Sequence, residues 1–371
     1  MAIILLGGDA TPSDVRLGKK FSAGTNYLVN GTLDAYATGE TVPVSKTGGK
    51  PLMNLRSMLG SYAVFNSNGY MAVYQYTSQT TTDINLYDPQ GNLIITKTYN
   101  QAGSSWSAYL TAVGDKFLYF GNNGGTEGVK IYILQQNGTV TSITKPSGAY
   151  VWTGGLDSTS NSVYVMDASN NYTLSKINLS TGTTTWSKAN VGYCRAGIET
   201  YDGGVLAYDG GGIKYINSSG STISGDLFVP SKGSSGGQTW LTRIGQNGSK
   251  TRFFVGSTAW SGGVVYDFDP SAISITQIWV PQEVPDFING TTYTATKTKD
   301  GGLFTMKNGT SKVYDSNGNL LSTQIIPNAG YSNSFDSGGD CIMNPVDGSI
   351  IVKNGAQNAF TQIYVSGYKL T

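Results

Sequence analysis

Short apolar stretches recur along the chain, and each follows a turn signal. Seven of them, rich in β-branched and aromatic residues, have the length and composition of buried β-strands. The anchor residues at or just before their starts, from Gly69 to Asp347, are separated by 46, 46, 42, 47, 51 and 46 positions. Such a regular period indicates one repeated supersecondary unit. The stretches are Tyr70 to Tyr76, Lys116 to Phe120, Ser162 to Met166, Gly204 to Tyr208, Thr251 to Val255, Gly302 to Met306 and Gly348 to Val352.

Each unit contains four short runs with strand character. A shorter run such as Tyr109 to Val113 precedes the anchor, and a second run such as Val129 to Leu134 follows the anchored one. A turn rich in Gly, Asn, Asp and Ser then leads to a further run such as Leu93 to Tyr99. Sheets stacked around an axis cover each other's apolar faces. We therefore predict an all-β fold, a seven-bladed β-propeller of four-stranded blades; two stacked β-sandwiches would not give one uniform period.

The last unit is too short to complete its blade. After Gly367 only four residues remain, which cannot form an outer strand. Because a ring must close, we expect Thr41 to Ser45 to supply that strand, since Pro43 is tolerated at a sheet edge. The predicted division is a docking segment over 1–40, a linker and ring-closing strand over 41–57, and the propeller over 58–371.

Composition excludes several kinds of chemistry. The 371 residues include no His, which excludes Ser-His-Asp and Cys-His relays, His-ligated metals and a histidine pH switch. Cys194 and Cys341 have no metal or redox spacing and are expected to be free, buried thiols. A net charge of +1 gives no indication of a nucleic-acid partner. The apolar run Ala2 to Leu6 is too short for a signal-peptide core or a membrane span, so we expect no membrane insertion.

The segment before the repeat begins with a helix signal. Thr11-Pro12-Ser13-Asp14 places a capping threonine, a proline at the first helical position and an aspartate near the positive end. The pattern Ala10-Thr11-x-x-Asp14-Val15-x-x-Gly18-Lys19-x-Phe21, with Gly31-Thr32-Leu33 after it, resembles a short module of bacteriophage tail, baseplate and fibre proteins, commonest in phages of Gram-positive hosts. Lys20 departs from it, because threonine is usual there.

The resemblance implies a virion protein of the tail or baseplate, made in the cytoplasm of a bacterial host. Its N-terminal segment would dock on other virion proteins, and its bulk would project outward, as in a homo-oligomeric fibre or baseplate ring. The residues that carry this attachment role are Thr11, Asp14, Val15 and Phe21.

Candidates for catalysis are few. Glycoside cleavage needs two carboxyl groups and no histidine. Local pairs are Glu199 with Asp202, Glu283 with Asp286, and Asp336 with Asp340, but such pairs more often cap turns or face solvent. We predict no catalytic residue, with a polysaccharide hydrolase or lyase on the same scaffold as the alternative.

Two motifs have structural interpretations. Asp315-x-Asn317-x-Asn319 opens like a calcium loop, but Ile326 stands where the bidentate carboxylate belongs, so we interpret it as a hairpin turn. The order Thr181-Gly182-x-x-x-Trp186 is similar to the repeat ending of quinone-dependent dehydrogenase propellers, and we interpret Trp186 as a wedge between blades. We expect no metal and no cofactor.

Aromatic residues gather at the predicted joints between blades. In a propeller, the joint from one blade's outer strand to the next blade's inner strand lies on one face around the axis. Rings beside amide and carboxylate groups suit carbohydrate, although they could also pack between blades. We therefore expect a non-enzymatic structural protein that binds host-surface glycan, with a capsid or tail-tube decoration protein as another alternative. The candidate glycan-binding residues are Trp106, Trp152, Trp240, Trp260, Glu283, Asp286 and Phe287.

Overall fold

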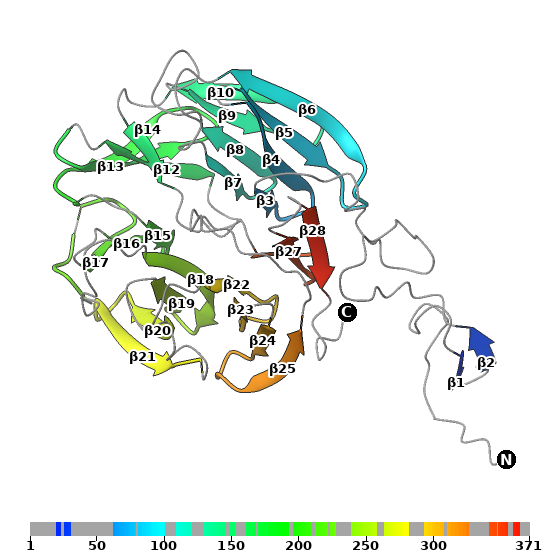
Figure 1. Cartoon of the computed structure of the whole chain (residues 1–371). Coiled ribbons are helices and arrows are strands. Elements are labelled where there is room, and N and C mark those ends of the chain that lie inside the picture. Colours follow the sequence, from blue (N-terminus) through cyan, green and yellow to red (C-terminus); the bar gives the residue numbers. More distant parts are fainter. Residues whose placement is uncertain are drawn as a thin grey trace.

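The structure of the chain, a computed structural model, is built from β-strands (Figure 1). No helix occurs among the residues that it describes, and so none there could cross a membrane. The described residues are 20–23, 26–30, 62–78, 81–100, 109–120, 130–144, 149–152, 161–167, 170–192, 196–208, 212–221, 223–227, 239–257, 263–281, 293–307, 310–325, 341–346, 348–354 and 359–363.

Five antiparallel sheets in the described part of the chain have four strands, each strand pairing with the next in sequence. Sheet 1 contains β3 (Tyr62–Phe65), β4 (Met71–Ser78), β5 (Thr81–Tyr87) and β6 (Leu93–Asn100). Sheet 2 contains β7 (Tyr109–Val113), β8 (Lys116–Phe120), β9 (Lys130–Leu134) and β10 (Val140–Thr144). Sheet 3 contains β11 (Ala149–Trp152), β12 (Ser162–Asp167), β13 (Thr173–Asn178) and β14 (Thr184–Lys188). Sheet 5 contains β18 (Thr239–Asn247), β19 (Lys250–Ser257), β20 (Gly263–Asp269) and β21 (Ser274–Trp279); sheet 6 contains β22 (Tyr293–Lys297), β23 (Leu303–Lys307), β24 (Thr310–Tyr314) and β25 (Leu320–Ile325).

Two further sheets have three strands among the described residues, and one hairpin stands apart from both groups. Sheet 4 contains β15 (Ala196–Glu199), β16 (Val205–Tyr208) and β17 (Ile213–Ile216); sheet 7 contains β26 (Cys341–Met343), β27 (Ile350–Asn354) and β28 (Ala359–Ile363); the hairpin contains β1 (Lys20–Ala23) and β2 (Asn26–Asn30).

Burial along the strands explains why the apolar runs were visible in the sequence. The second strands lie inside the molecule: Phe117–Phe120 in β8 and Val205–Tyr208 in β16 are buried on both faces. Outer strands alternate or are exposed, as in β10 and β14. A strand covered on both faces requires a continuous apolar run, whereas an edge strand does not.

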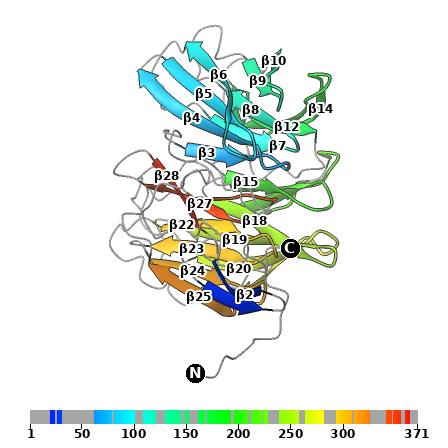
Figure 2. The same cartoon turned by 90° about the vertical axis from the view of Figure 1, so that its right-hand side faces the viewer.

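The apolar core is divided among the junctions between sheets. One buried cluster spans each neighbouring pair from sheets 1 and 2 through sheets 6 and 7. Another joins sheet 7 back to sheet 1, where Ile351 of β27 packs with Ala63, Met71 and Val73. The first strands also lie beside one another, as β15 beside β18, β18 beside β22, β22 beside β26, and β26 beside β3. Figure 1 shows outer strands such as β6, β21 and β25 at the periphery, and Figure 2 shows sheets 1 and 6 at opposite ends of the side view.

Tryptophans on outer strands dock against glycines of the next sheet. Trp186 of β14 is 8% exposed and packs so closely on Gly220 that a Cβ there would lie 2.6 Å from its Cδ2. Trp279 of β21 packs on Gly318 in the same way, also at 2.6 Å. Both glycines have φ near +70 to +90°, a region that non-glycine residues rarely adopt. The interpretation of Trp186 as an inter-blade wedge is confirmed.

The all-β propeller is confirmed, with four-stranded blades in five of the sheets; the fourth strand expected in sheet 7, at Thr41 to Ser45, lies outside the described residues. In sheet 4, an irregular segment takes the outer position. Ile223 bridges Ile216, Ser224 N donates to Tyr215 O at 2.9 Å, and Leu227 N donates to Ile213 O at 2.8 Å. The Ser224 hydroxyl accepts the Tyr215 N–H at 2.8 Å, so a side chain replaces a ladder bond and the segment does not form a regular strand.

Two predicted elements fall outside the described residues. They are the ring-closing strand at Thr41 to Ser45 and the helix that begins at Thr11. The β1–β2 hairpin was not predicted from the sequence, and its strands pair only with each other (Figure 1).

Candidate functional site

Because neighbouring strands in each sheet are antiparallel, successive connections lie alternately at one end of the sheet and at the other. The turns from first to second and from third to fourth strand lie at one end, which we call the hairpin face. The second-to-third connections and the joints between sheets lie at the other end, the loop face. On the hairpin face, neighbouring sheets contact each other through their turns: Ser67 N donates to Gly114 O at 2.8 Å, and Lys299 Nζ donates to Val346 O at 2.9 Å.

Turns of the hairpin face satisfy their own polar groups. Asp315 accepts hydrogen bonds from the backbone N–H groups of Asn317 and Asn319 and from the Asn319 amide, each at 2.8 Å. Burial works against ionisation, but these hydrogen bonds hold the pKa of the Asp315 carboxyl below its usual value. The interpretation of this motif as a hairpin turn is confirmed.

A buried carboxylate lies at the junction of sheets 3 and 4. Glu199, at the end of β15, is 3% exposed and accepts the Tyr164 hydroxyl at 2.8 Å and the Lys176 ammonium at 3.0 Å. Lys176 Nζ lies 5.4 Å from the Tyr164 ring centroid. Burial, then the Glu199 charge and hydrogen bond, raise the pKa of Tyr164, so its hydroxyl stays a proton donor.

The same region reaches sheet 5 through Arg243 of β18. Its Nη1 donates to the backbone oxygen of Glu199 at 3.3 Å, and its guanidinium lies 4.9 Å from the ring centroid of Tyr201. Nearby, Asp202 accepts the hydroxyls of Thr200, at 2.6 Å, and of Tyr215. Burial and the Asp202 hydrogen bond raise the pKa of Tyr215. Glu199 and Asp202, a carboxylate pair proposed from the sequence, are therefore bound to different sets of partners.

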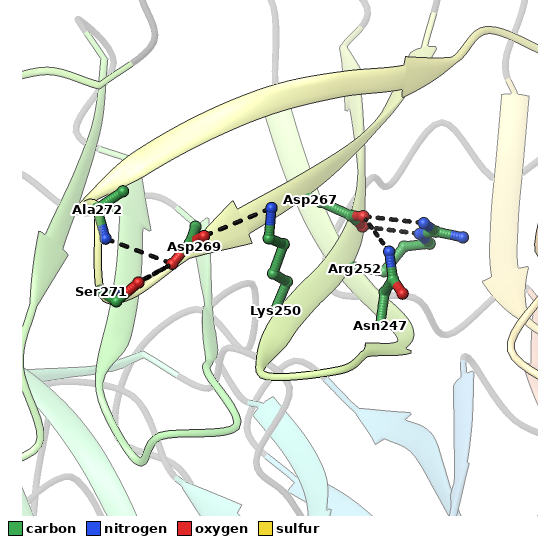
Figure 3. A network of polar contacts seen from close by, with 7 residues as sticks. All are labelled: Asn247, Lys250, Arg252, Asp267, Asp269, Ser271 and Ala272. Atoms are coloured by element: carbon green, nitrogen blue, oxygen red, sulfur yellow. Dashed lines mark hydrogen bonds and ion pairs between the residues drawn. The ribbon is translucent and has the colours of Figure 1, made fainter.

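A second buried ion pair lies within sheet 5 (Figure 3). Arg252 of β19 binds Asp267 of β20 through two contacts, Nε to Oδ1 at 2.7 Å and Nη2 to Oδ2 at 2.9 Å. The third guanidinium nitrogen donates to Ser316 O in sheet 6 at 2.6 Å. Asn247 adds a bond to Asp267 at 3.0 Å. Burial works against ionisation, yet the bonds from Arg252 and Asn247 hold the pKa of Asp267 below its usual value.

Lys250 and Asp269 form a more exposed pair beside it (Figure 3). Lys250 Nζ lies 3.4 Å from Asp269 Oδ2, and Asp269 Oδ1 accepts the Ser271 hydroxyl at 2.6 Å. That hydroxyl bond and the bonds from the turn's backbone lower the pKa of Asp269 to about 2.

The loop face presents one exposed aromatic in the described part of the chain, at the corner of sheet 3. Tyr172, between β12 and β13, is 44% exposed and has a φ of 48°. Asn171 before it has a φ of 51°, and Asn190 in the joint after β14 has a φ of 61°. The run Asn170-Asn171-Tyr172 between two strand-like stretches is a turn signal, although none of its residues was predicted as a site residue from the sequence.

Most residues selected from the sequence lie outside the described part of the chain. Trp106, Trp260, Glu283, Asp286 and Phe287 do so, and so do Thr11, Asp14 and Val15.

Three of the selected residues lie in described strands. Phe21 lies in β1 opposite Val29. Trp240 is in β18, opposite Gly256, and Trp152 ends β11 at its hairpin-face end, opposite Tyr164. Neither tryptophan lies in a joint, because the first strands of sheets 3 and 5 begin before them.

One of the two cysteines lies in the described part of the chain. Cys341 is a free, buried thiol, as expected, whereas Cys194 lies outside the described residues. The described side chains include no group of three or more Cys, Asp or Glu placed to hold a metal ion.

Comparisons with known proteins point to the fold. No protein-family model and no curated protein matches the sequence. The β-propeller domain of Myceliophteria thermophila Cps50 (Swd1) is similar with a TM-score of 0.57 at 11% identity, over 84% of this chain and 98% of that one.

Two lyases have slightly lower TM-scores. A catalytically inactive virginiamycin B lyase from Staphylococcus aureus, solved with quinupristin, gives a TM-score of 0.55 at 14% identity, over 85% of this chain and 98% of that one. Oligogalacturonate lyase in complex with manganese gives 0.53 at 11% identity, over 90% of this chain and 99% of that one. At such identities the similarity shows the propeller fold alone.

Proposed function

We propose that the chain is a non-enzymatic virion protein of a bacteriophage tail, baseplate or fibre, whose propeller is a rigid disc that binds host-surface glycan. The observation that supports the non-enzymatic part of the proposal is that two buried carboxylates, Glu199 and Asp267, are bound by other side chains of the chain. Glu199 is bound by Lys176 and Tyr164, and Asp267 is bound by Arg252. A general acid or nucleophile must reach a substrate, whereas these groups tie strands and sheets together.

The rigid disc in this proposal is a closed ring in which all five four-stranded and both three-stranded sheets are blades, seven in total. The contact of β26 with β3 and the packing of Ile351 against sheet 1 support closure. On the hairpin face, Val346 of sheet 7 reaches Gly69 of sheet 1, where a Cβ would lie 2.8 Å from its Cγ2. The outer position of sheet 7 is the place for the strand expected at Thr41 to Ser45.

The virion role rests on the resemblance of the first residues to the phage module. The β1–β2 hairpin, which contains Phe21, pairs with none of the propeller sheets (Figure 1). A two-stranded hairpin is marginally stable by itself in water, so this segment needs a surface to pack on. Other virion proteins, arranged in a homo-oligomer, are the partners we propose.

The test uses virions and cell walls. Antibodies raised against the full chain should label the tail region of purified particles, and the full chain should co-sediment with cell walls of a Gram-positive host. It should release no reducing or unsaturated sugar from them. Particles without label, or a chain absent from virion proteins by mass spectrometry, would contradict the virion role.

The alternative is a polysaccharide hydrolase or lyase on the same scaffold. Similar solved propellers include an oligogalacturonate lyase, which is why sugar release must be assayed with unsaturated products included. Release that disappears in Glu199→Gln or in Glu283→Gln would favour this enzyme over the structural role.

A further inference from the structure

Non-glycine residues with a left-handed backbone are concentrated at one corner of the loop face. Among the described residues, twelve glycines have a positive φ, but only four other residues do. Three of these four, Asn171, Tyr172 and Asn190, meet beside sheet 3. The fourth, Ile273, belongs to a turn of the hairpin face. Asparagine tolerates this conformation, but it is unfavourable for a bulky aromatic residue such as tyrosine.

Backbone hydrogen bonds hold this corner in place. Asn190 N donates to Asn171 O at 2.9 Å, and Val191 N donates to Tyr172 O at 3.2 Å. Thr173 N donates to Asn170 O at 3.1 Å, which closes the turn. Val191 is fully buried, so the joint that braces Tyr172 is anchored in the core. The surroundings thus impose an unfavourable φ on a tyrosine, and such strain is concentrated at functional sites.

The side chains at this corner suit an uncharged ligand that has both apolar and hydroxyl surfaces. Tyr172 is 44% exposed and offers a ring, and Asn170, Asn171 and Asn190, all exposed, offer amide donors and acceptors. The carboxylate at the end of β12, Asp167, accepts the Asn170 N–H at 3.2 Å. A pyranose stacks its C–H face on an aromatic ring while its hydroxyls bond to amides.

We propose that Tyr172, with the amides of Asn171 and Asn190, is a stacking site for a neutral pyranose unit of a surface polysaccharide. This site rests on the proposed glycan-binding function and gives it a position and a ligand class. The hydrogen-bonded turn holds the backbone that carries the ring in one conformation, so little backbone entropy is lost when a sugar binds.

The experiment compares variants of the full chain on an array of neutral hexose and N-acetylhexosamine oligosaccharides, with affinity then measured by calorimetry for the strongest binder. Tyr172→Gly removes the ring and relieves the backbone, because glycine accepts a positive φ. We expect at least about tenfold weaker binding together with an unchanged or raised melting temperature. Tyr172→Phe should bind within about threefold of the parent chain, since it keeps the stacking ring.

Two controls separate the site from the fold. Ile273→Gly relieves a similar φ of 47° on the opposite face, and Tyr201→Ala removes an exposed aromatic from the hairpin face. Neither should change the affinity.

Each contrary result has a distinct meaning. Undiminished binding by Tyr172→Gly, or a marked fall in its melting temperature, would overturn the stacking site while leaving the proposed glycan binding intact. A parent chain that binds no sugar on the array would overturn the site and the glycan-binding part of the proposed function together, but not the virion role.

Discussion

The junction of sheets 3 and 4 and the junction of sheets 5 and 6 both contain a buried carboxylate, but they use it differently. At the first junction the ion pair itself crosses between sheets, because Lys176 belongs to β13 and Glu199 to β15. At the second, Arg252 and Asp267 belong to neighbouring strands of one sheet, and the pair reaches sheet 6 through the Arg252 bond to Ser316 O. The Lys176–Glu199 pair therefore connects two blades. The Arg252–Asp267 pair mainly stabilises one blade and orients the remaining guanidinium nitrogen of Arg252 toward the next blade.

This difference concerns how a ring of separate sheets becomes rigid. Each sheet buries its faces only against its neighbours, so a weak junction affects the whole ring. Apolar contacts such as Trp186 on Gly220 fill the junctions, and the charged pairs add directional bonds.

The largest effect should come from breaking the charged pairs. Glu199→Gln leaves the Lys176 ammonium, 14% exposed, without its carboxylate, and should lower the free energy of unfolding by about 3 kcal/mol. Asp267→Asn should have a cost of about the same size, because Arg252 also loses its charge partner. Denaturant unfolding measures both losses.

Hydrogen exchange distinguishes the two variants. Glu199→Gln should speed amide exchange in β13 and β15, on both sides of the junction, whereas Asp267→Asn should speed it chiefly in β19 and β20. The double variant Glu199→Gln/Lys176→Met should recover part of the lost stability. If exchange rises in the same strands for both single variants, the distinction between the two junctions is wrong.

A smaller effect is expected from filling the apolar docking site. Gly220→Ala places a Cβ 2.6 Å from Trp186 at a φ of 70°, so either the indole or the turn must move. We expect a loss of about 2 kcal/mol in thermal unfolding. Gly248→Ala is the matched control, because Gly248 has a φ of 59° but no atom within 4 Å of a Cβ. Equal losses in both would mean that backbone strain alone, and not packing on Trp186, explains the effect.

The smallest effect concerns acid. The pKa of Asp269 is about 2 in the folded chain, below its ordinary 3.8, so its contribution is complete above about pH 4 and is lost as the pH falls toward 2. Asp269→Asn should therefore make the urea midpoint of unfolding depend slightly less on pH over that pH range. Asp267 also has a lowered pKa, so Asp267→Asn should flatten the profile in the same direction. A steeper profile in either variant would contradict these assignments.

The sequence predicted the repeat, the second strands and the wedge role of Trp186, because continuous apolar runs and Gly-rich turns are local signals. It could not predict the partners of Glu199, since Lys176 and Tyr164 lie 23 and 35 residues away on another sheet. Nor could it predict the irregular outer segment of sheet 4, where a Ser224 hydroxyl replaces a backbone group. Tyr172 was missed because tyrosine favours strands, whereas hydrogen bonds from Asn190 and Val191, distant in sequence, help to hold it in a left-handed turn.

The most direct test of the closed ring joins its first sheet to its last. An ideal Cβ on Gly69 lies 3.4 Å from the Val346 Cβ, close to the separation of a disulfide, so Gly69→Cys/Val346→Cys should oxidise to an intramolecular bridge, seen by peptide mass spectrometry. Gly69→Cys/Gly248→Cys, which pairs turns of sheets 1 and 5, should stay reduced. If the first pair remains reduced in folded, oxidised protein, or links only different molecules, sheets 7 and 1 are not neighbours and the ring is not closed.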